Sequence, residues 1–578
     1  MKKLLTGNEA IARGAYESGV RVAVAYPGTP STEILENVAQ YREIYSEWAP
    51  NEKVALEVGI GASLAGARVL CAMKHVGVNV AADPLMTFSY TGVNGGLVLV
   101  SADDPGMHSS QNEQDNRIFA QFAKIALLEP SDSQEAKDFV GLGLEISERC
   151  DTPVMLRTTT RISHSKSLVE EAERTPLALR PYVKDIPKYV MTPAGARARH
   201  VVVEQRRAAL AEFAETTGVN RVEWNTEEIG VITSGVVYQY AREALGDRVS
   251  YLKLGFTHPL PQKMIRDFAA RVKKLYVIEE LEPYLETQIK AWGIACHGKD
   301  LFPRIGEISA DLIAEKVLGV SKEVPEPEKL PVRPPVMCPG CPHRGAFYVL
   351  KKLNLPVTGD IGCYALGAAP PLSATDSTVC MGASISMAHG WMKAIEGERP
   401  DRVVAVIGDS TFFHSGITSL LDIAYNRSNA ITMILDNRIT AMTGHQHHPG
   451  TGRTLMGEER PEIDLVGLVK ALGIDRVSIV DPYDLKATEA ALKEAIAYDG
   501  PSVIITRRPC ALIEKTQPVK YLVKAGKCKT CRICLRLGCP ALEYDGETVQ
   551  INPLTCYSCG VCIDLCPTKA IVREEGEL

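Results

Sequence analysis

Eight of the chain's sixteen cysteines lie between residues 528 and 566, and this crowding constrains the fold of the last segment more than any other sequence feature. They form two similar runs, Cys528-x2-Cys531-x2-Cys534-x4-Cys539-Pro540 and Cys556-x2-Cys559-x2-Cys562-x3-Cys566-Pro567. In a chain of 578 residues, cysteines at this spacing indicate metal or redox chemistry rather than disulfides.

The two runs predict two 4Fe-4S clusters that exchange one ligand. A cubane needs four thiolates, and a tight loop supplies only three of them, so the fourth comes from the other run, next to a proline. The two ligand sets are therefore Cys528, Cys531, Cys534 and Cys566 for one cluster, and Cys556, Cys559, Cys562 and Cys539 for the other. The x4 spacing before Cys539 departs from the commoner x3. Zinc is the alternative, but it leaves the third cysteine of each run and the prolines without a role.

Composition and charge exclude several function classes. The formal net charge of −6 argues against nucleic acid as the main partner. No apolar run approaches the ~20 residues that cross a bilayer. Residues 1–9 lack the apolar stretch of a signal peptide. We therefore expect a cytoplasmic protein that binds neither nucleic acid nor a membrane.

The rest of the chain alternates short apolar runs with helical stretches, which is typical of parallel α/β sheets. The predicted fold class is α/β, with three parallel-sheet domains and a small C-terminal two-cluster domain. The expected divisions are an α/β domain at 1–165, a helical connection at 166–225, a second α/β domain at 226–319, a Pro-rich linker at 320–336, a third α/β domain at 337–518 and the cysteine-rich tail at 519–578. Strands are expected at 20–26, 95–101, 229–235, 249–254, 275–280, 403–407 and 431–435.

Two strands of the third domain end in polar residues. The strand at 403–407 runs into Gly408-Asp409-Ser410, and the strand at 431–435 runs into Asp436-Asn437-Arg438. If the two strands are neighbours, Asp409 and Asn437 lie side by side, and their oxygens suit Mg²⁺, which keeps other positions for phosphate and water. Gly408 would let the backbone approach the phosphates. The alternative is that these residues only form turns.

Gly408-Asp409, a spacer of about thirty residues and Asn437 resemble the signature of thiamine-diphosphate enzymes. Ser410 stands where the usual pattern has Gly, and Asp436 where it has Asn. The resemblance implies thiamine diphosphate as a cofactor, bound through residues 408–410 and 437. It also implies Mg²⁺ held by Asp409, Asn437 and the backbone carbonyl of Ile439.

Enzymes of this kind hold the aminopyrimidine ring of the coenzyme with a glutamate from a second domain. Glu57 precedes a helix rich in small residues, at 58–68, and is similar to that glutamate. Glu52 also fits the role, and the small-residue helix favours Glu57. The alternative is an acidic residue that complements a helix dipole.

The segment Tyr26-Pro27-Gly28-Thr29-Pro30-Ser31-Thr32 resembles the substrate-side loop of the 2-oxoacid:ferredoxin oxidoreductases. By that resemblance Thr29 contacts the substrate. The alternative is a tight turn with a helix cap at Ser31.

A second group of cysteines is spread over the third domain. Cys338 and Cys341 belong to Cys338-Pro339-Gly340-Cys341-Pro342-His343-Arg344, and Cys363 and Cys510 follow later. These four are similar to the set that holds the cluster nearest the coenzyme in the same family, which implies a third 4Fe-4S cluster. The alternatives are buried small hydrophobic residues, or zinc on the first pair.

The order of domains as a whole resembles the large (alpha) subunits of the indolepyruvate:ferredoxin oxidoreductases. The four parts correspond to a pyrimidine-type domain, a transketolase-C-like domain, a diphosphate-type domain and a ferredoxin-type tail. A gamma-type domain is not recognisable in the sequence, so the resemblance implies a smaller (beta) subunit as partner, with ferredoxin as the electron acceptor.

The implied reaction converts an aryl 2-oxoacid, coenzyme A and two oxidised ferredoxins to an aryl-acetyl-CoA, CO2 and two reduced ferredoxins. The same motifs fit pyruvate, branched-chain 2-oxoacids or 2-oxoglutarate. Two functions of other classes also remain open, namely a non-oxidative thiamine-diphosphate decarboxylase or synthase, and a non-catalytic electron-transfer subunit.

Overall fold

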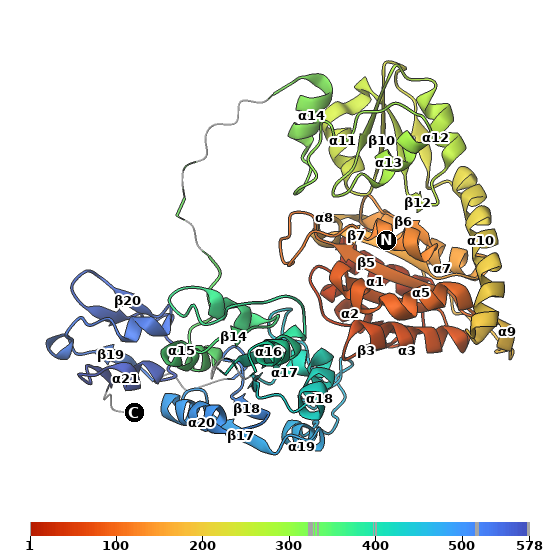
Figure 1. The fold of residues 1–578 in the computed structure, drawn as a ribbon. Coiled ribbons are helices and arrows are strands. Elements are labelled where there is room, and N and C mark those ends of the chain that lie inside the picture. The colour runs from red at the N-terminus through yellow and green to blue at the C-terminus, as the bar shows by residue number, and fades with distance from the viewer. Residues whose placement is uncertain are drawn as a thin grey trace. The chain divides into compact units, whose positions relative to one another are not determined.

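The computed structural model describes residues 2–321, 328, 330–331, 334–396, 398, 402–514 and 519–574 (Figure 1). The chain divides into two compact units, Met1–Glu328 and Lys329–Leu578. This division falls within the predicted Pro-rich linker, of which residues 322–327, 329, 332 and 333 lie outside the described residues.

The first unit begins with a large sheet whose strands are parallel except for one at the edge. Side by side, they are β12 (Phe256–His258), β6 (Ala126–Leu128), β7 (Val154–Thr159), β5 (Leu97–Asp103), β4 (Val69–Lys74), β2 (Val22–Ala25) and β3 (Tyr45–Trp48), with β12 antiparallel to β6. All residues of β4, β5 and β7 are buried, as expected of parallel strands covered on both faces.

Helices cover both faces of this sheet. α1 packs against α7, and apolar residues of α3, α4, α5 and α6 form one core with β4 and β5. The bounds are α1 (Gly7–Glu17), α2 (Thr32–Val38), α3 (Glu52–Leu64), α4 (His75–Val80), α5 (Ala82–Thr91), α6 (Arg117–Ala123), α7 (Ser133–Cys150) and α8 (Thr160–His164). The carboxyl ends of β2, β4 and β5 therefore meet at one edge, where ligand sites of such sheets lie.

A second sheet in the same unit comprises β13 (Lys274–Ile278), β10 (Ile229–Ser234), β11 (Ser250–Leu254) and β9 (Arg221–Glu223), with only β9 antiparallel. Its helical elements are α11 (Val237–Leu245), η1 (Gly246–Arg248), α12 (Gln262–Ala269), α13 (Tyr284–Ala291) and α14 (Ala310–Leu318). β12 follows β11 of this sheet along the chain but pairs with β6 of the first sheet. The chain therefore passes from one sheet to the other at this point.

The segment at 166–225 is less helical than the sequence predicts. It contains two strands, β8 (Lys166–Glu170) and β9, and two helices, α9 (Ile186–Tyr189) and α10 (Pro193–Thr216). β8 pairs with β1 (Lys2–Thr6). Between β8 and α9 the chain is irregular, because Pro176 and Pro181 remove backbone donors that a helix needs.

The second unit is built on a fully parallel sheet in the order β14 (Val357–Thr358), β15 (Val404–Gly408), β16 (Ile431–Asp436), β18 (Ser502–Arg507) and β17 (Arg476–Val480). Apolar residues of α15 and α20 form a core on one face, and those of α16, α18 and α19 form a core on the other. The helical elements are α15 (His343–Leu353), η2 (Cys363–Ala368), α16 (Ala383–Ala394), α17 (Asp409–Thr411), η3 (Phe412–Gly416), α18 (Ile417–Tyr425), α19 (Leu465–Ala471) and α20 (Leu485–Ala497).

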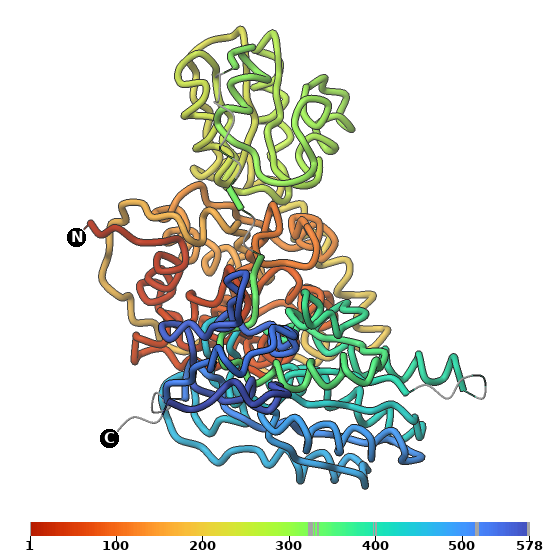
Figure 2. Tube along the Cα trace, turned by 90° about the vertical axis from the view of Figure 1, so that its left-hand side faces the viewer, coloured from red at the N-terminus to blue at the C-terminus, as the bar shows by residue number. Residues whose placement is uncertain are grey.

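The cysteine-rich tail belongs to the second unit and lies beside its sheet domain, as Figure 2 shows in dark blue. Its first and last strands, β19 (Tyr521–Val523) and β22 (Ile571–Arg573), pair antiparallel, as do β20 (Leu542–Tyr544) and β21 (Val549–Ile551). The helical elements are η4 (Ala525–Lys527), η5 (Cys534–Leu537) and α21 (Val561–Leu565). The predicted fold class is confirmed, and so are the expected strands.

Among the described residues, no helix is both long and apolar enough to cross a bilayer.

Candidate functional site

Asp409 lies at the carboxyl edge of the second unit's sheet, as the sequence predicts. β15 and β16 are parallel neighbours with Gly408 opposite Leu435, so Asp409 is the next residue beyond the paired strands. The buried carboxylate accepts hydrogen bonds from the backbone N–H of Ser410 at 2.9 Å and of Arg438 at 2.8 Å, and lies 3.1 Å from His448 Nε2. Burial alone would raise the pKa of Asp409, but His448 and the two N–H groups outweigh it and lower that pKa.

Asn437 is buried. The residue that follows it, Arg438, donates its backbone N–H to Asp409, which places Asn437 near this carboxylate. Asn437 Oδ1 accepts the backbone N–H of Ile439 at 3.2 Å, and its Nδ2 lies 3.4 Å from Nε2 of His343. An ionised carboxylate and an amide oxygen at one edge are the hard-oxygen donor set that suits Mg²⁺. The residues present therefore fit the predicted metal.

Gly408 has a structural reason of its own. A Cβ at Gly408 would lie 2.5 Å from the ring of Tyr364, whose hydroxyl donates to the carbonyl of Ile361 at 2.7 Å. Ser410, which stands where the usual pattern has Gly, accepts a hydrogen bond from the Thr440 hydroxyl at 2.8 Å.

Two histidines border this site, and the sequence motifs predict neither of them. Burial lowers the pKa of His343 to about 4, against an opposing effect of Asp409, so this ring is neutral at pH 7. The only sequence signal for His343 is its place directly after the Cys-Pro-Gly-Cys-Pro run. His448 lies 39 positions from Asp409 in a loop, so no short motif joins the two.

Cys338, Cys341, Cys363 and Cys510 are contributed by three segments of the second unit and influence one another electrostatically. Burial raises the pKa of Cys341 to about 12, with contributions from Cys363 and Cys338. Burial also raises the pKa of Cys363 to about 11, with contributions from Cys510 and Cys338. The thiols are thus near enough to affect one another's ionisation. The backbone N–H of Cys510 donates to the carbonyl of Asn437 at 2.9 Å. One of the four cysteines therefore lies next to the residues predicted to bind Mg²⁺.

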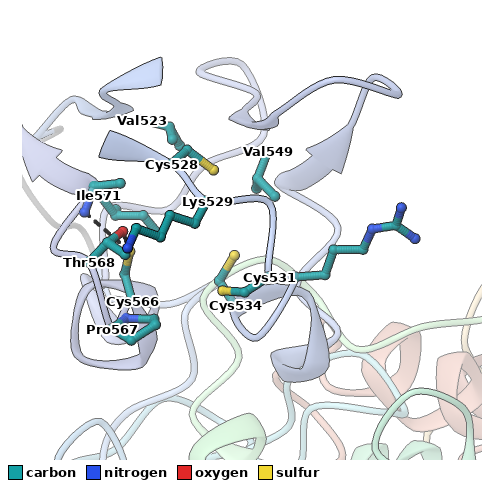
Figure 3. Close-up of a pocket in the computed structure, with 12 residues that line it drawn as sticks. Val523, Cys528, Lys529, Cys531, Cys534, Val549, Cys566, Pro567, Thr568 and Ile571 are labelled. Atoms are coloured by element: carbon teal, nitrogen blue, oxygen red, sulfur yellow. Dashed lines mark hydrogen bonds between the residues drawn. The ribbon is translucent and has the colours of Figure 1, made fainter. Parts of the chain in front are cut away.

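The four cysteines predicted for the first tail cluster line one cavity. Figure 3 shows Cys528, Cys531 and Cys534 from the first run facing it together with Cys566 from the second. The rest of the lining is largely apolar and includes Val523, Val549, Ala570 and Ile571. The Ala570 N–H lies 3.2 Å from the Cys566 sulfur. Such donors favour the thiolate form that an iron–sulfur cluster needs.

The thiols of the other tail set also affect one another's ionisation. Burial raises the pKa of Cys562 to about 12, with Cys559, Cys539 and Cys556 contributing in that order. Gly538 adopts φ +69° after η5 and so accommodates the extra residue of the x4 spacing. In the described part of the chain, no three or more His, Cys, Asp or Glu side chains are placed to hold a metal ion.

Arg344 links the two cysteine regions of the second unit. This buried side chain donates from Nε to the carbonyl of Cys338 at 3.1 Å and from one terminal nitrogen to the carbonyl of Gly538, which precedes Cys539. A cation thus lies between the Cys338 loop and the second tail set.

In the first unit, the loop at 26–32 follows β2 at the carboxyl edge. Gly28 packs against Lys74, and the carbonyl of Thr29 accepts a hydrogen bond from the Ser109 hydroxyl at 3.3 Å. Ser31 does not cap α2, contrary to the simple turn interpretation, because its hydroxyl donates to the carbonyl of Gly28 at 2.8 Å.

The two candidate glutamates lie in different surroundings. Glu52 is 7% exposed at the first position of α3, directly after β3, and a Cβ on Gly77 would lie 2.7 Å from its Oε1. Glu57 lies five residues further along α3, its side chain is 44% exposed, and it pairs with Lys53. At 1.5 Å per residue, Glu57 is about 7.5 Å further along the helix axis from the sheet edge.

The sequence matches three domain families. Residues 13–229 match the thiamine-diphosphate-binding domain of pyruvate flavodoxin/ferredoxin oxidoreductases, residues 360–506 the C-terminal TPP-binding domain of thiamine pyrophosphate enzymes, and residues 549–572 the 4Fe-4S binding domain.

Relatives match over the full length. The indolepyruvate oxidoreductase subunit IorA of Pyrococcus horikoshii is 42% identical over 100% of this chain and 98% of its own length. Its namesake in Archaeoglobus fulgidus is 40% identical over 99% and 97%. The chain belongs to the IorA family.

The more distant 2-oxoglutarate synthase subunit KorA of Methanothermobacter thermautotrophicus is 26% identical over 52% of this chain and 94% of its own length. As a member of the IorA family, the protein is a subunit of a 2-oxoacid oxidoreductase, and its domains match those that bind thiamine diphosphate and a 4Fe-4S cluster.

Proposed function

We propose that this chain is the catalytic subunit of an enzyme that decarboxylates aryl 2-oxoacids of the indolepyruvate and phenylpyruvate type. It transfers the resulting aryl-acetyl group to coenzyme A and two electrons to ferredoxin, in complex with a smaller beta subunit. The substrate class rests on the full-length relatives, which are indolepyruvate oxidoreductase subunits.

The observation that carries the oxidative function is the bond from the Cys510 N–H to the Asn437 carbonyl. It joins a predicted cluster ligand to a predicted Mg²⁺ ligand, so electrons leaving the coenzyme have an acceptor site next to it. A non-oxidative decarboxylase needs no such acceptor, and a non-catalytic electron carrier has no use for the buried Asp409.

In the proposed site, Asp409, Asn437 and the carbonyl of Ile439 hold Mg²⁺, which anchors the diphosphate. Bound thiamine diphosphate supplies the electron sink for decarboxylation. The chain's own groups hold this anchor rigid, because two backbone N–H groups orient the Asp409 carboxylate. Thr29 contacts the substrate from the loop after β2.

We assign activation of the coenzyme to Glu52 rather than to Glu57, which the sequence favours. Glu52 is buried at the start of α3 and lies against Gly77 of α4, whereas Glu57 is exposed and paired with Lys53. A carboxylate that exchanges a hydrogen bond with a coenzyme ring needs a position with little water.

The proposed electron path has three 4Fe-4S clusters within the second unit. It starts at the cluster held by the set that includes Cys338. It continues past Arg344 to the cluster of the set that includes Cys539. It ends at the cluster of the set that includes Cys531, which is exposed. An exposed terminal cluster suits transfer to a separate ferredoxin. A cytoplasmic location stays a prediction.

The test is an anaerobic assay of the chain co-purified with its smaller subunit. Viologen reduction should require both a 2-oxoacid and coenzyme A, and the catalytic efficiency with phenylpyruvate should exceed that with pyruvate or 2-oxoglutarate by at least about tenfold, as one well-filled pocket allows. Aldehyde formation without coenzyme A would instead indicate a non-oxidative decarboxylase. Preference for another 2-oxoacid would change the substrate class only.

A further inference from the structure

Lys74 lies where three strand ends of the first sheet meet. It is the last residue of β4, which runs between β2 and β5. Gly28, in the loop after β2, packs against the Lys74 side chain, with its would-be Cβ 3.1 Å from Lys74 Cβ. The Lys74 ammonium donates to the carbonyl of Ser109 at 2.6 Å, and the hydroxyl of Ser109 in turn donates to the carbonyl of Thr29.

The ammonium of Lys74 is buried without an opposite charge in contact. The residue is 8% exposed, and among the described residues no carboxylate oxygen lies within the 4.0 Å of an ion pair. Asp104 is close enough to act on it electrostatically, but its oxygens are held by the Ser109 N–H, the Ser110 hydroxyl and the Thr160 hydroxyl.

Other buried cations of the same unit are paired. Arg117 contacts Asp115 and Glu279, and Lys253 contacts Glu135, each within ion-pair distance. The same is true of Lys137, Arg157 and Arg206. A buried charge normally requires such a partner, because removing a charge from water is strongly unfavourable. The exception at Lys74 therefore calls for an anion from outside the chain.

We propose that Lys74 binds the carboxylate of the 2-oxoacid substrate at the edge between the Thr29 loop and Ser109. This inference rests on the proposed function, in which the Thr29 loop faces the substrate. Two observations favour a monoanionic carboxylate over a phosphate: Lys74 is a single cation, and its direct partners, the Ser109 carbonyl and hydroxyl, are neutral. The lowered pKa of about 8, caused by burial, still leaves most of the ammonium charged at pH 7.

The test compares Lys74→Met with Lys74→Arg in the complex with the smaller subunit, with Lys273→Met as a control. Lys273 is a 72% exposed lysine of the same unit, so its loss changes the net charge equally. The probes are phenylpyruvate in steady-state kinetics, and phenylacetate and phenylacetamide in calorimetric binding. The two binding probes share a ring and differ in the carboxylate.

Lys74→Met should weaken phenylacetate binding and raise the KM for phenylpyruvate by about 10- to 100-fold, the usual loss for a charge-assisted hydrogen bond. Binding of phenylacetamide should not change, and Lys74→Arg should recover at least a third of the lost affinity on a logarithmic scale. Lys273→Met should behave as wild type. Folding is expected to survive, because the substitution removes an unpaired buried charge.

Equal weakening of both probes would overturn the proposal in favour of a role in pocket shape, as would no weakening of either. Loss of coenzyme A or thiamine diphosphate binding with phenylacetate binding intact would indicate a phosphate anchor and also overturn it. Failure of the proposed function looks different. If wild type oxidises only a non-aryl 2-oxoacid and Lys74→Met raises the KM for that acid, the aryl assignment fails and the carboxylate assignment stands.

Discussion

The two sheet edges that resemble coenzyme sites bury charge in opposite ways. At the edge of the second unit, Asp409 accepts two backbone N–H groups and lies against His448. At the edge of the first unit, the Lys74 ammonium donates to the neutral Ser109 and forms no ion pair with any described residue. The first arrangement holds an ionised ligand ready for a cation, and the second leaves a cation ready for an anion. The hydrogen bonds of Asp409 are thus supplied by the chain itself, whereas the counter-charge of Lys74 is left for a ligand to supply.

The largest expected effect concerns the sheet edge at Asp409 in the second unit. Asp409→Ala should abolish retention of thiamine diphosphate, because Mg²⁺ loses its only charged protein ligand in the predicted set. The brown iron–sulfur absorption of the tail should remain. The matched control is Asp436→Asn, which restores the residue of the usual pattern beside Asp409 and should retain coenzyme. Coenzyme content after desalting measures both, and normal content in Asp409→Ala would refute the metal assignment.

The next effect separates the two glutamates of α3. Glu52→Gln should lower turnover by at least about 100-fold, within the range for loss of acid–base assistance, with cluster content unchanged. Glu57→Gln should cost no more than about threefold, because an exposed ion pair such as that with Lys53 contributes little. The reverse result would return the role to Glu57.

The third effect tests whether the second unit holds a cluster outside its tail. Oxygen-protected wild type should contain about twelve irons per chain, and Cys338→Ser about eight, since each cubane has four. Cys380→Ser is the control, because Cys380 is exposed and belongs to none of the predicted sets. Eight irons in fully loaded wild type would confine the clusters to the tail.

The smallest expected effect is the change that Lys74 causes in the free energy of unfolding of the first unit. The folded-state pKa of Lys74 is lowered from 10.5 to about 8 by burial, so the unfolded chain binds this proton more tightly than the folded chain does. The penalty is therefore complete below about pH 8 and disappears as the pH rises to about 10.5.

Lys74→Met should raise the free energy of unfolding of the first unit by up to about 3 kcal/mol at pH 7, from the size of that pKa difference. The melting temperature should rise by a few degrees, and the gain should vanish near pH 10.5. Calorimetry at several pH values measures this, and a gain independent of pH would show that packing, not charge, is responsible.

Local signals made much of this architecture predictable. The expected strands at 20–26, 95–101 and 431–435 appear as β2, β5 and β16, because continuous apolar runs bounded by turn residues have few other stable arrangements. Helix over 166–225 was only partly right, since Pro176 and Pro181 break the segment. The local pattern favoured Glu57 over Glu52, but both lie on α3, and only packing against other elements shows which of them is buried.

The fold class and the family resemblance were predictable from the order of apolar runs and motifs, and the grouping of the thiols stays a prediction from their spacing, since a few residues limit what one loop can wrap around a cluster. Three features came from the folded arrangement alone: the burial of Glu52 on α3, the bridge that Arg344 makes from the Cys338 loop to Gly538, and the lack of an ionic partner for Lys74 among the described residues. The physical reason is that burial and charge pairing depend on residues distant in the chain. Lys74 meets Gly28 and Ser109 only because parallel strands bring their carboxyl ends to one edge.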